Sequence, residues 1–137
     1  MAASIAALGA VAAAAVLTWV LRGSAPCQDL GRLKSFRPDT VSFVSCVPAF
    51  VVTAGPEPVV FLALTPHLAG EPLRWDERRR VFYSPFHGEQ FDSSGHLLSG
   101  PARRDLWRCP VAVRNGELWI AVPGGTRSED VKNACAL

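Results

Sequence analysis

The sequence predicts an all-β domain of small antiparallel sheets, preceded by one N-terminal transmembrane helix. Three observations support this prediction. The chain has 137 residues, among them 11 glycines and 11 prolines, a composition typical of a loop-rich β domain rather than a helical bundle. Short runs of β-branched and aromatic residues alternate with these breaks, and an Asn-Gly pair joins two of the runs. Finally, the first 21 residues contain no charged side chain.

The uncharged N-terminal run predicts a helix that spans a membrane once. Ala2 to Leu21 make twenty largely apolar residues, nine of them alanine, and a helix of that length spans roughly 30 Å. Trp19 and the following Arg22 are typical of an interfacial anchor. No basic residue precedes the run and no A-x-A site ends it, so a cleaved signal peptide is less favoured. We therefore expect a transmembrane helix over residues 1–22 and a linker over 23–39.

The β domain is expected over residues 40–123. Asn115-Gly116 supports the positive φ angles of a type I′ turn and so predicts a hairpin between the two runs that flank it. Proline and glycine breaks separate the earlier runs, as expected for antiparallel strands joined by turns. The predicted strands are Thr40–Cys46, Phe50–Thr53, Val59–Leu64, Arg80–Tyr83, Val111–Arg114 and Glu117–Val122.

The remaining charged and C-terminal segments suggest no further domain. Arg78 to Arg80 follow two acidic residues and are interpreted as a solvated hairpin tip. The formal net charge of +2 comes without a concentrated basic face, which excludes nucleic acid as an expected partner. In the tail, residues 124–137, Thr126 and Glu129 have the spacing of a capping box and predict a short helix over Arg127–Ala134.

The four cysteines leave two interpretations open. None has C-x-x-C spacing, so zinc or thioredoxin-like chemistry has no support. Their even number permits two disulfides in an oxidising compartment, and free, partly buried thiols are the alternative. The cysteines are Cys27, Cys46, Cys109 and Cys135.

Two short motifs carry the functional signal. The first is T-P-H-L-A-G at Thr65–Gly70, and the second is S-P-F-H-G-E-Q-F at Ser84–Phe91, followed by Gly-Pro-Ala at Gly100–Ala102. Sixteen residues separate His67 from Ser84. Their order and spacing resemble the C-x-H and C-x-x-H-G-x-x-F boxes of Rieske iron-sulfur proteins. The resemblance implies a Rieske-like antiparallel β-sandwich and a subunit similar to the Rieske subunit of cytochrome bc and b6f complexes.

The sequence departs from the family at the cysteine ligands. Rieske centres hold one iron with two histidines and the other with two thiolates, and here Thr65 and Ser84 stand at the thiolate positions. A hydroxyl is a hard donor that does not replace a soft thiolate on iron-sulfide. In quinol-oxidising members of the family, two further cysteines form a disulfide that ties the two loops together. The resemblance places these cysteines at or beside Glu71 and at Phe86, so this pair is missing as well. We therefore expect that the [2Fe-2S] cluster has been lost and that the protein has no cofactor.

The two histidines of the boxes are the only metal candidates. His67 and His87 are expected on adjacent loops, and Glu71 and Glu89 are near them in sequence. Two histidines without a positioned third ligand bind metal weakly, so no metal is expected. The alternative function is a membrane-anchored electron-transfer or metal-binding protein that uses both histidines with a non-standard ligand set. His96 is expected to be an exposed loop residue.

A hydrolase that uses Ser84 and His87 is excluded. Both residues belong to one tight loop, no G-x-S-x-G motif is present, and no acid is placed to orient the histidine. We therefore expect no catalytic residue and no enzyme activity.

The loop tips suggest a contact surface instead. Family members dock this tip on a partner, and an apolar tip with an exposed aromatic is suited to an interface. The docking candidates are Pro66, Leu68, Pro85 and Phe86. The expected function is a non-catalytic accessory subunit of a respiratory or photosynthetic electron-transport complex. Its expected partners are the other subunits and membrane lipid.

The expected location is a bacterial or organelle inner membrane, crossed once. The four basic residues that follow the helix favour a soluble domain on the cytoplasm-like side; they are Arg22, Arg32, Lys34 and Arg37. The resemblance favours the positive side, periplasmic, intermembrane or lumenal, and we expect the domain there.

Overall fold

The computed structural model describes residues 29–45, 47–67, 71–121 and 135. Within these residues no helix is long and apolar enough to cross a membrane. The transmembrane helix predicted over 1–22 and the short helix predicted over Arg127–Ala134 fall outside the described residues.

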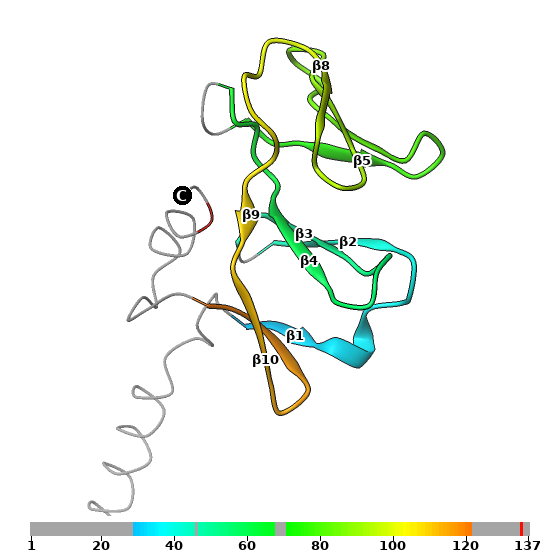
Figure 1. Cartoon of the computed structure of the whole chain (residues 1–137), viewed down its shortest axis with the longest axis vertical. Helices are drawn as coiled ribbons and strands as arrows, with labels where there is room; N and C mark the ends of the chain where they lie inside the picture. Colours follow the sequence, from blue (N-terminus) through cyan, green and yellow to red (C-terminus); the bar gives the residue numbers. More distant parts are fainter. Residues whose placement is uncertain (1–28, 46, 68–70, 122–134, 136–137) are drawn as a thin grey trace, which may run out of the picture.

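The described chain forms three small antiparallel sheets, which Figure 1 shows one above another. The lower sheet has the order β1 (Asp29–Arg32), β11 (Glu117–Ile120) and β10 (Val111–Arg114). The middle sheet has the order β2 (Val41–Val44), β3 (Ala49–Val52), β4 (Val59–Leu62) and β9 (Arg108–Cys109). The upper sheet consists of β5 (Arg74–Asp76), β6 (Val81–Tyr83), β7 (Gln90–Asp92) and β8 (Leu97–Ser99). A short 3-10 helix, η1 (Leu33–Ser35), follows β1.

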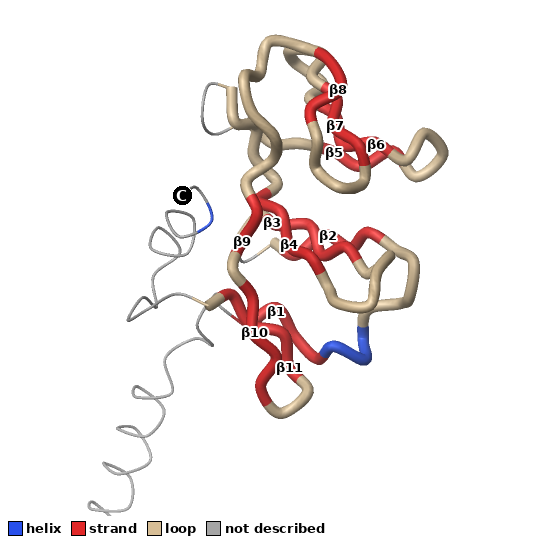
Figure 2. Tube along the Cα trace, in the orientation of Figure 1, coloured by secondary structure: helices blue, strands red, loops and turns tan. Residues whose placement is uncertain are grey.

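The two central strands of the middle sheet, β3 and β4, are buried on both faces, which explains why they form continuous apolar runs. Successive side chains of a strand point to opposite faces. Val51 and Val60 accordingly join the core shared with the lower sheet, whereas Phe50 and Phe61 join the core shared with the upper sheet. Figure 2 shows the three groups of strands and the long loops that join them.

The predicted hairpin is confirmed. Val111 pairs with Ile120 and Arg114 with Glu117, and the turn residues Asn115 and Gly116 have φ angles of 52° and 78°. The all-β prediction is likewise confirmed for the described residues. The arginine run of residues 78–80 lies, as predicted, in the exposed turn between β5 and β6.

Five short strands were not predicted. β1 lies in the segment expected to be a linker, yet Asp29 pairs with Trp119 and Arg32 with Glu117. Its sequence, DLGR, has no β-branched residue. Its extended conformation therefore depends on its pairing with β11, a strand of the C-terminal hairpin. The other unpredicted strands, β5, β7, β8 and β9, have two or three residues each, too few to show an alternation.

Candidate functional site

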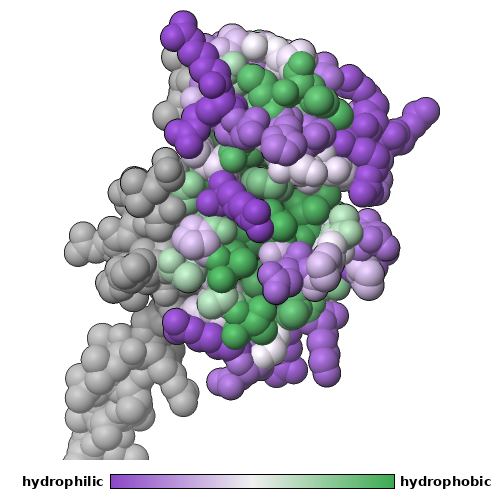
Figure 3. All heavy atoms as spheres, in the orientation of Figure 1, coloured by the Kyte–Doolittle hydropathy of each residue, from purple (hydrophilic) through white to green (hydrophobic). Residues whose placement is uncertain are grey.

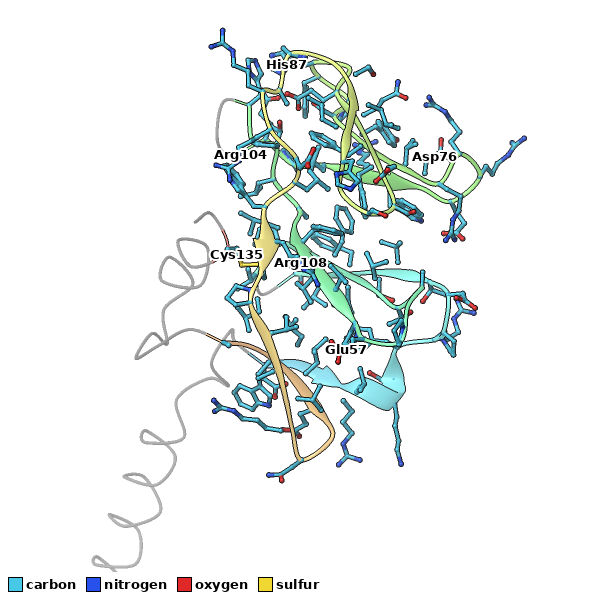
Figure 4. The ribbon with its side chains drawn as sticks, in the orientation of Figure 1. Glu57, Asp76, His87, Arg104, Arg108 and Cys135 are labelled. Atoms are coloured by element: carbon cyan, nitrogen blue, oxygen red, sulfur yellow. A yellow bond between two sulfur atoms is a disulfide. The ribbon has the colours of Figure 1, made fainter. Side chains whose placement is uncertain are left out.

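The two motifs form adjacent loops at the outer end of the upper sheet (Figure 4). The first loop is closed by the bridge between Leu64 and Pro72 and by the bond from Thr65 N–H to the Glu71 carbonyl, 2.9 Å. The second loop joins β6 to β7, and Ser84 N–H donates to the Glu89 carbonyl at 3.0 Å. The Rieske spacing therefore places both motifs at one end of the molecule.

The structure brings the two histidines of the motifs together. The ring centroids of His67 and His87 are 5.4 Å apart, with the rings edge to face. Nδ1 of His87 lies 2.7 Å from Oε2 of Glu71, and both side chains are about one-third exposed. This contact joins the first loop to the second beside Phe86, where the resemblance places a disulfide.

The hydroxyls at the two thiolate positions are buried and already hydrogen-bonded. Thr65 donates to the carboxylate of Glu89 and accepts from His67 N–H at 3.0 Å. Ser84 accepts from the N–H groups of Phe86 and His87 at 3.3 and 3.2 Å. Each hydroxyl therefore stabilises the turn that carries its histidine. The expectation that no acid is placed to orient His87 is wrong, because Glu71 contacts its Nδ1. Ser84 itself is a buried turn residue, only 2% exposed.

Glu89 is the site residue whose place differs most from expectation. The sequence suggests only that Glu89, like Glu71, is a carboxylate near the histidines, but Glu89 is fully buried. Its Oε2 accepts a hydrogen bond from the Thr65 hydroxyl. Its Oε1 has no hydrogen-bond partner among the described residues. Gly100 packs directly on it, because a Cβ there would lie 2.6 Å from the Glu89 Cα. The glycine, at φ 104°, thus explains the Gly-Pro exit of the second motif.

His96 is exposed, as predicted, and belongs to a separate pair. Its Nδ1 lies 2.9 Å from Oδ2 of Asp105, and the other Asp105 oxygen accepts Leu97 N–H at 2.9 Å. The hydrogen bond and charge of Asp105 raise the pKa of His96 above 6.5. The Leu97 N–H and the hydrogen bond with His96 lower the pKa of Asp105 below 3.8. The sequence carried no signal for this pair.

The tip of the second loop is exposed and apolar. Phe86 is 65% exposed, and its neighbour Pro85 is exposed as well. Pro66, on the first loop, is partly buried. Leu68, the fourth docking candidate, lies outside the described residues.

Neither cysteine chemistry nor a third metal ligand accompanies the loops in the part of the chain that the structure describes. Cys109 on β9 is bonded to Cys135, 26 residues later, and lies against the lower core rather than in a loop. For these two residues the disulfide interpretation is confirmed. The described residues contain no group of three or more His, Cys, Asp or Glu placed to hold a metal ion.

Comparison with known proteins identifies the proteins that this chain resembles. No protein-family model matches the chain. The cytochrome b6-f complex iron-sulfur subunit of Synechococcus sp. (strain CC9605) is 34% identical over 59 residues, 43% of this chain and 33% of that protein. The corresponding subunit of Parasynechococcus marenigrum (strain WH8102) is 29% identical over 77 residues, 54% of this chain and 43% of that protein. The chain thus spans less than half the length of these relatives.

Comparison with solved structures also finds a Rieske protein with a similar fold. The plasma membrane Rieske protein PetC3 from Synechocystis PCC 6803 superposes with a TM-score of 0.52 at 24% identity, covering 68% of this chain and 97% of that chain. A chain of a hyperthermophilic respiratory Complex III gives 0.53 at 22% identity, covering 83% and 96%. The described part of this chain is a Rieske-like domain. The two curated relatives described above are iron-sulfur subunits of cytochrome b6-f complexes.

The same relatives contradict the prediction that the protein has no cofactor. They are named iron-sulfur subunits, and Rieske centres carry a [2Fe-2S] cluster. The prediction of no cofactor is therefore wrong, because this domain resembles proteins that are named for their iron-sulfur cluster.

The residues described at the two loops do not fit the ligand set of a Rieske centre. They offer two imidazoles and two hydroxyls, and the hydroxyls are engaged with Glu89 and with backbone N–H groups. Hard oxygen donors do not take the place of thiolates on iron-sulfide. We therefore derive no step of the function from a cluster at Thr65, His67, Ser84 and His87.

Proposed function

We propose that this protein is a non-catalytic subunit of a respiratory or photosynthetic electron-transport complex, in which the Rieske-like domain docks on a neighbouring subunit. The observation that carries the proposal is the combination of this fold with an exposed aromatic, Phe86, at the loop tip. The similarity to iron-sulfur subunits of cytochrome b6-f complexes supports a place in such a complex. An aromatic at an exposed tip can fill a pocket of a partner and anchor an interface.

Among the described residues, the proposed docking surface consists of Pro66, Pro85 and Phe86. Among the described residues, two side-chain hydrogen bonds connect the loops that carry this surface. One joins Glu71 to His87, and the other joins Thr65 to Glu89. A tip whose backbone is already ordered loses little conformational entropy on binding. The domain would therefore contribute to assembly and stability of the complex.

The proposed arrangement has residues 1–22 in the membrane and the domain on the positive side. The disulfide between Cys109 and Cys135 supports that side, because disulfides persist in periplasmic, lumenal and other oxidising compartments. It outweighs the basic residues after the helix, since these are few and the positive-inside tendency has exceptions.

Gentle detergent extraction of the native membrane, followed by size separation, tests the proposal. We expect the chain to migrate at fixed stoichiometry with cytochrome- or quinone-bearing subunits. Migration as a small, lone species would contradict it. Iron and acid-labile sulfide measured in the same anaerobic fractions would report the cofactor content of the complex.

A further inference from the structure

A pocket between the middle and upper sheets lies apart from the two histidine loops. Its volume is about 340 Å³, within the range of small-molecule sites. The walls come from the β3–β4 turn, from β4, from the β7–β8 turn and from β9. The residues used below are Gly55, Phe61, Ser93, Ser94 and Arg108.

The floor of the pocket is apolar and fixed. Phe61 is 4% exposed, and its ring lies 5.9 Å from that of Phe82, edge to face. Gly95 packs on the same ring, since a Cβ at Gly95 would lie 2.6 Å from a ring carbon of Phe61. The floor is therefore held from two sides by the upper sheet.

One cation stands beside this floor. Arg108 pairs with Phe61 across β9 and β4, and paired residues of antiparallel strands project from the same face of a sheet. In the part of the chain that the structure describes, Arg108 is exposed and forms no ion pair. Figure 4 shows it on the middle sheet, where β9 lies beside β4, and Figure 3 shows hydrophobic surface gathered over the middle of the molecule.

The opposite wall presents two hydroxyls. No hydrogen bond among the described residues occupies the side chain of Ser93 or Ser94. The preceding Asp92 is the acidic group to consider, but its Oδ1 accepts the N–H groups of Ser94 and His96 at 2.8 and 3.0 Å. Its negative charge is thus stabilised by the turn.

We propose that this pocket binds a small carboxylate with a compact apolar body. The carboxylate would pair with the Arg108 guanidinium, which matches its planar geometry. The apolar body would lie on Phe61, and the serine hydroxyls would donate to the remaining carboxylate lone pairs. This site is independent of the docking tip.

Benzoate is a suitable probe, and benzamide is its uncharged counterpart. Both are titrated into the full-length protein in detergent at constant ionic strength, with binding followed by ligand-observed NMR. We expect benzoate to bind saturably with a dissociation constant of about 1 mM, as is typical of a ligand of this size. Arg108→Gln should weaken binding about tenfold or more, because the charge-assisted pair is removed.

A second variant adds a side chain at a residue that lines the pocket, without touching the charge. Gly55 lines the pocket and has no positive φ, and a Cβ there would meet only the Glu57 carbonyl at 3.8 Å. Gly55→Val should therefore fold normally and weaken benzoate binding. Arg103→Gln, an exposed arginine outside the pocket, is the matched control and should bind as the wild type does. Equal affinities in wild type and Arg108→Gln, equal binding of benzamide, or no saturation in the wild type would each overturn the proposal.

Discussion

The lower and middle sheets are stabilised differently from the loops at the outer end of the upper sheet. The former enclose aliphatic residues such as Val60 and Leu118, both fully buried, and are closed by the disulfide at Cys109. The loops instead depend on side-chain hydrogen bonds, one between Thr65 and Glu89 and one between Glu71 and His87. Apolar burial is tolerant of changes in sequence as long as volume is kept. Buried polar contacts require their particular partners.

This difference explains how the ligand positions of a Rieske domain can change while the fold is kept. The cores that define the sheets include neither His67 nor His87. The loop residues that replace thiolates carry out a local task, which is to satisfy backbone N–H groups and a buried carboxyl. Substitutions in the two regions should therefore differ in size and kind.

The largest effect is expected in the aromatic core that joins the middle and upper sheets. Phe82 is fully buried, with its ring 5.0 Å from Phe50 and 4.6 Å from Trp75. Phe82→Ala should cost about 3–5 kcal/mol of unfolding free energy, measured by urea denaturation. Phe86→Ala, at the exposed tip, is the control and should change stability by less than about 0.5 kcal/mol. Similar losses in both variants would contradict the comparison.

Removing the disulfide should have the next largest effect. A bridge over a separation of 26 residues is worth about 3–4 kcal/mol in the chain-entropy relation. The double variant Cys109→Ser with Cys135→Ser should lose that amount in the same denaturation experiment. It leaves Cys27 and Cys46 unchanged, so the effect belongs to one bridge. An unchanged midpoint would show that the bridge does not constrain the unfolded chain.

The polar contact beneath the loops should show strong coupling. Thr65→Val leaves the Glu89 carboxyl without its only partner among the described residues, which should cost about 1–3 kcal/mol or more. Glu89→Leu should cost a similar amount because the buried Thr65 O–H then has no acceptor, although its oxygen still accepts the His67 N–H. Removing both partners should cost clearly less than the sum. Additive losses would mean that the two side chains do not act as a pair.

These predictions separate what could be deduced from the sequence and what could not. Strands β2, β3 and β4 are long enough and rich enough in β-branched and aromatic residues to predict, and the Asn-Gly turn indicated the last hairpin. β1, β5, β7, β8 and β9 were not predicted, because they are short and are held by their pairing with neighbouring strands. The adjacency of His67 and His87 followed from the family spacing. The burial of Glu89 did not, because it depends on Thr65, 24 residues earlier, and on Gly100.

The smallest expected effect concerns the exposed pair of His96 and Asp105. Asp105 raises the pKa of His96, and its own pKa is lowered below 3.8, so the pair stabilises the fold below pH 6.5 as long as Asp105 remains ionised. That contribution is lost as the pH rises through the elevated value. NMR titration of the His96 ring should give a pKa that falls toward 6.5 in Asp105→Asn. The same pKa in wild type and variant would contradict the contact.

The most direct test of the proposed role is site-specific photo-crosslinking in the native membrane. A photoreactive residue is placed at Phe86 on the tip, and at Val113, 51% exposed on the lower sheet, as the control. If the tip docks within an electron-transport complex, position 86 should crosslink to one of its membrane subunits and position 113 should not. Crosslinks from position 113 alone, or none to such a subunit from position 86, would contradict the docking role.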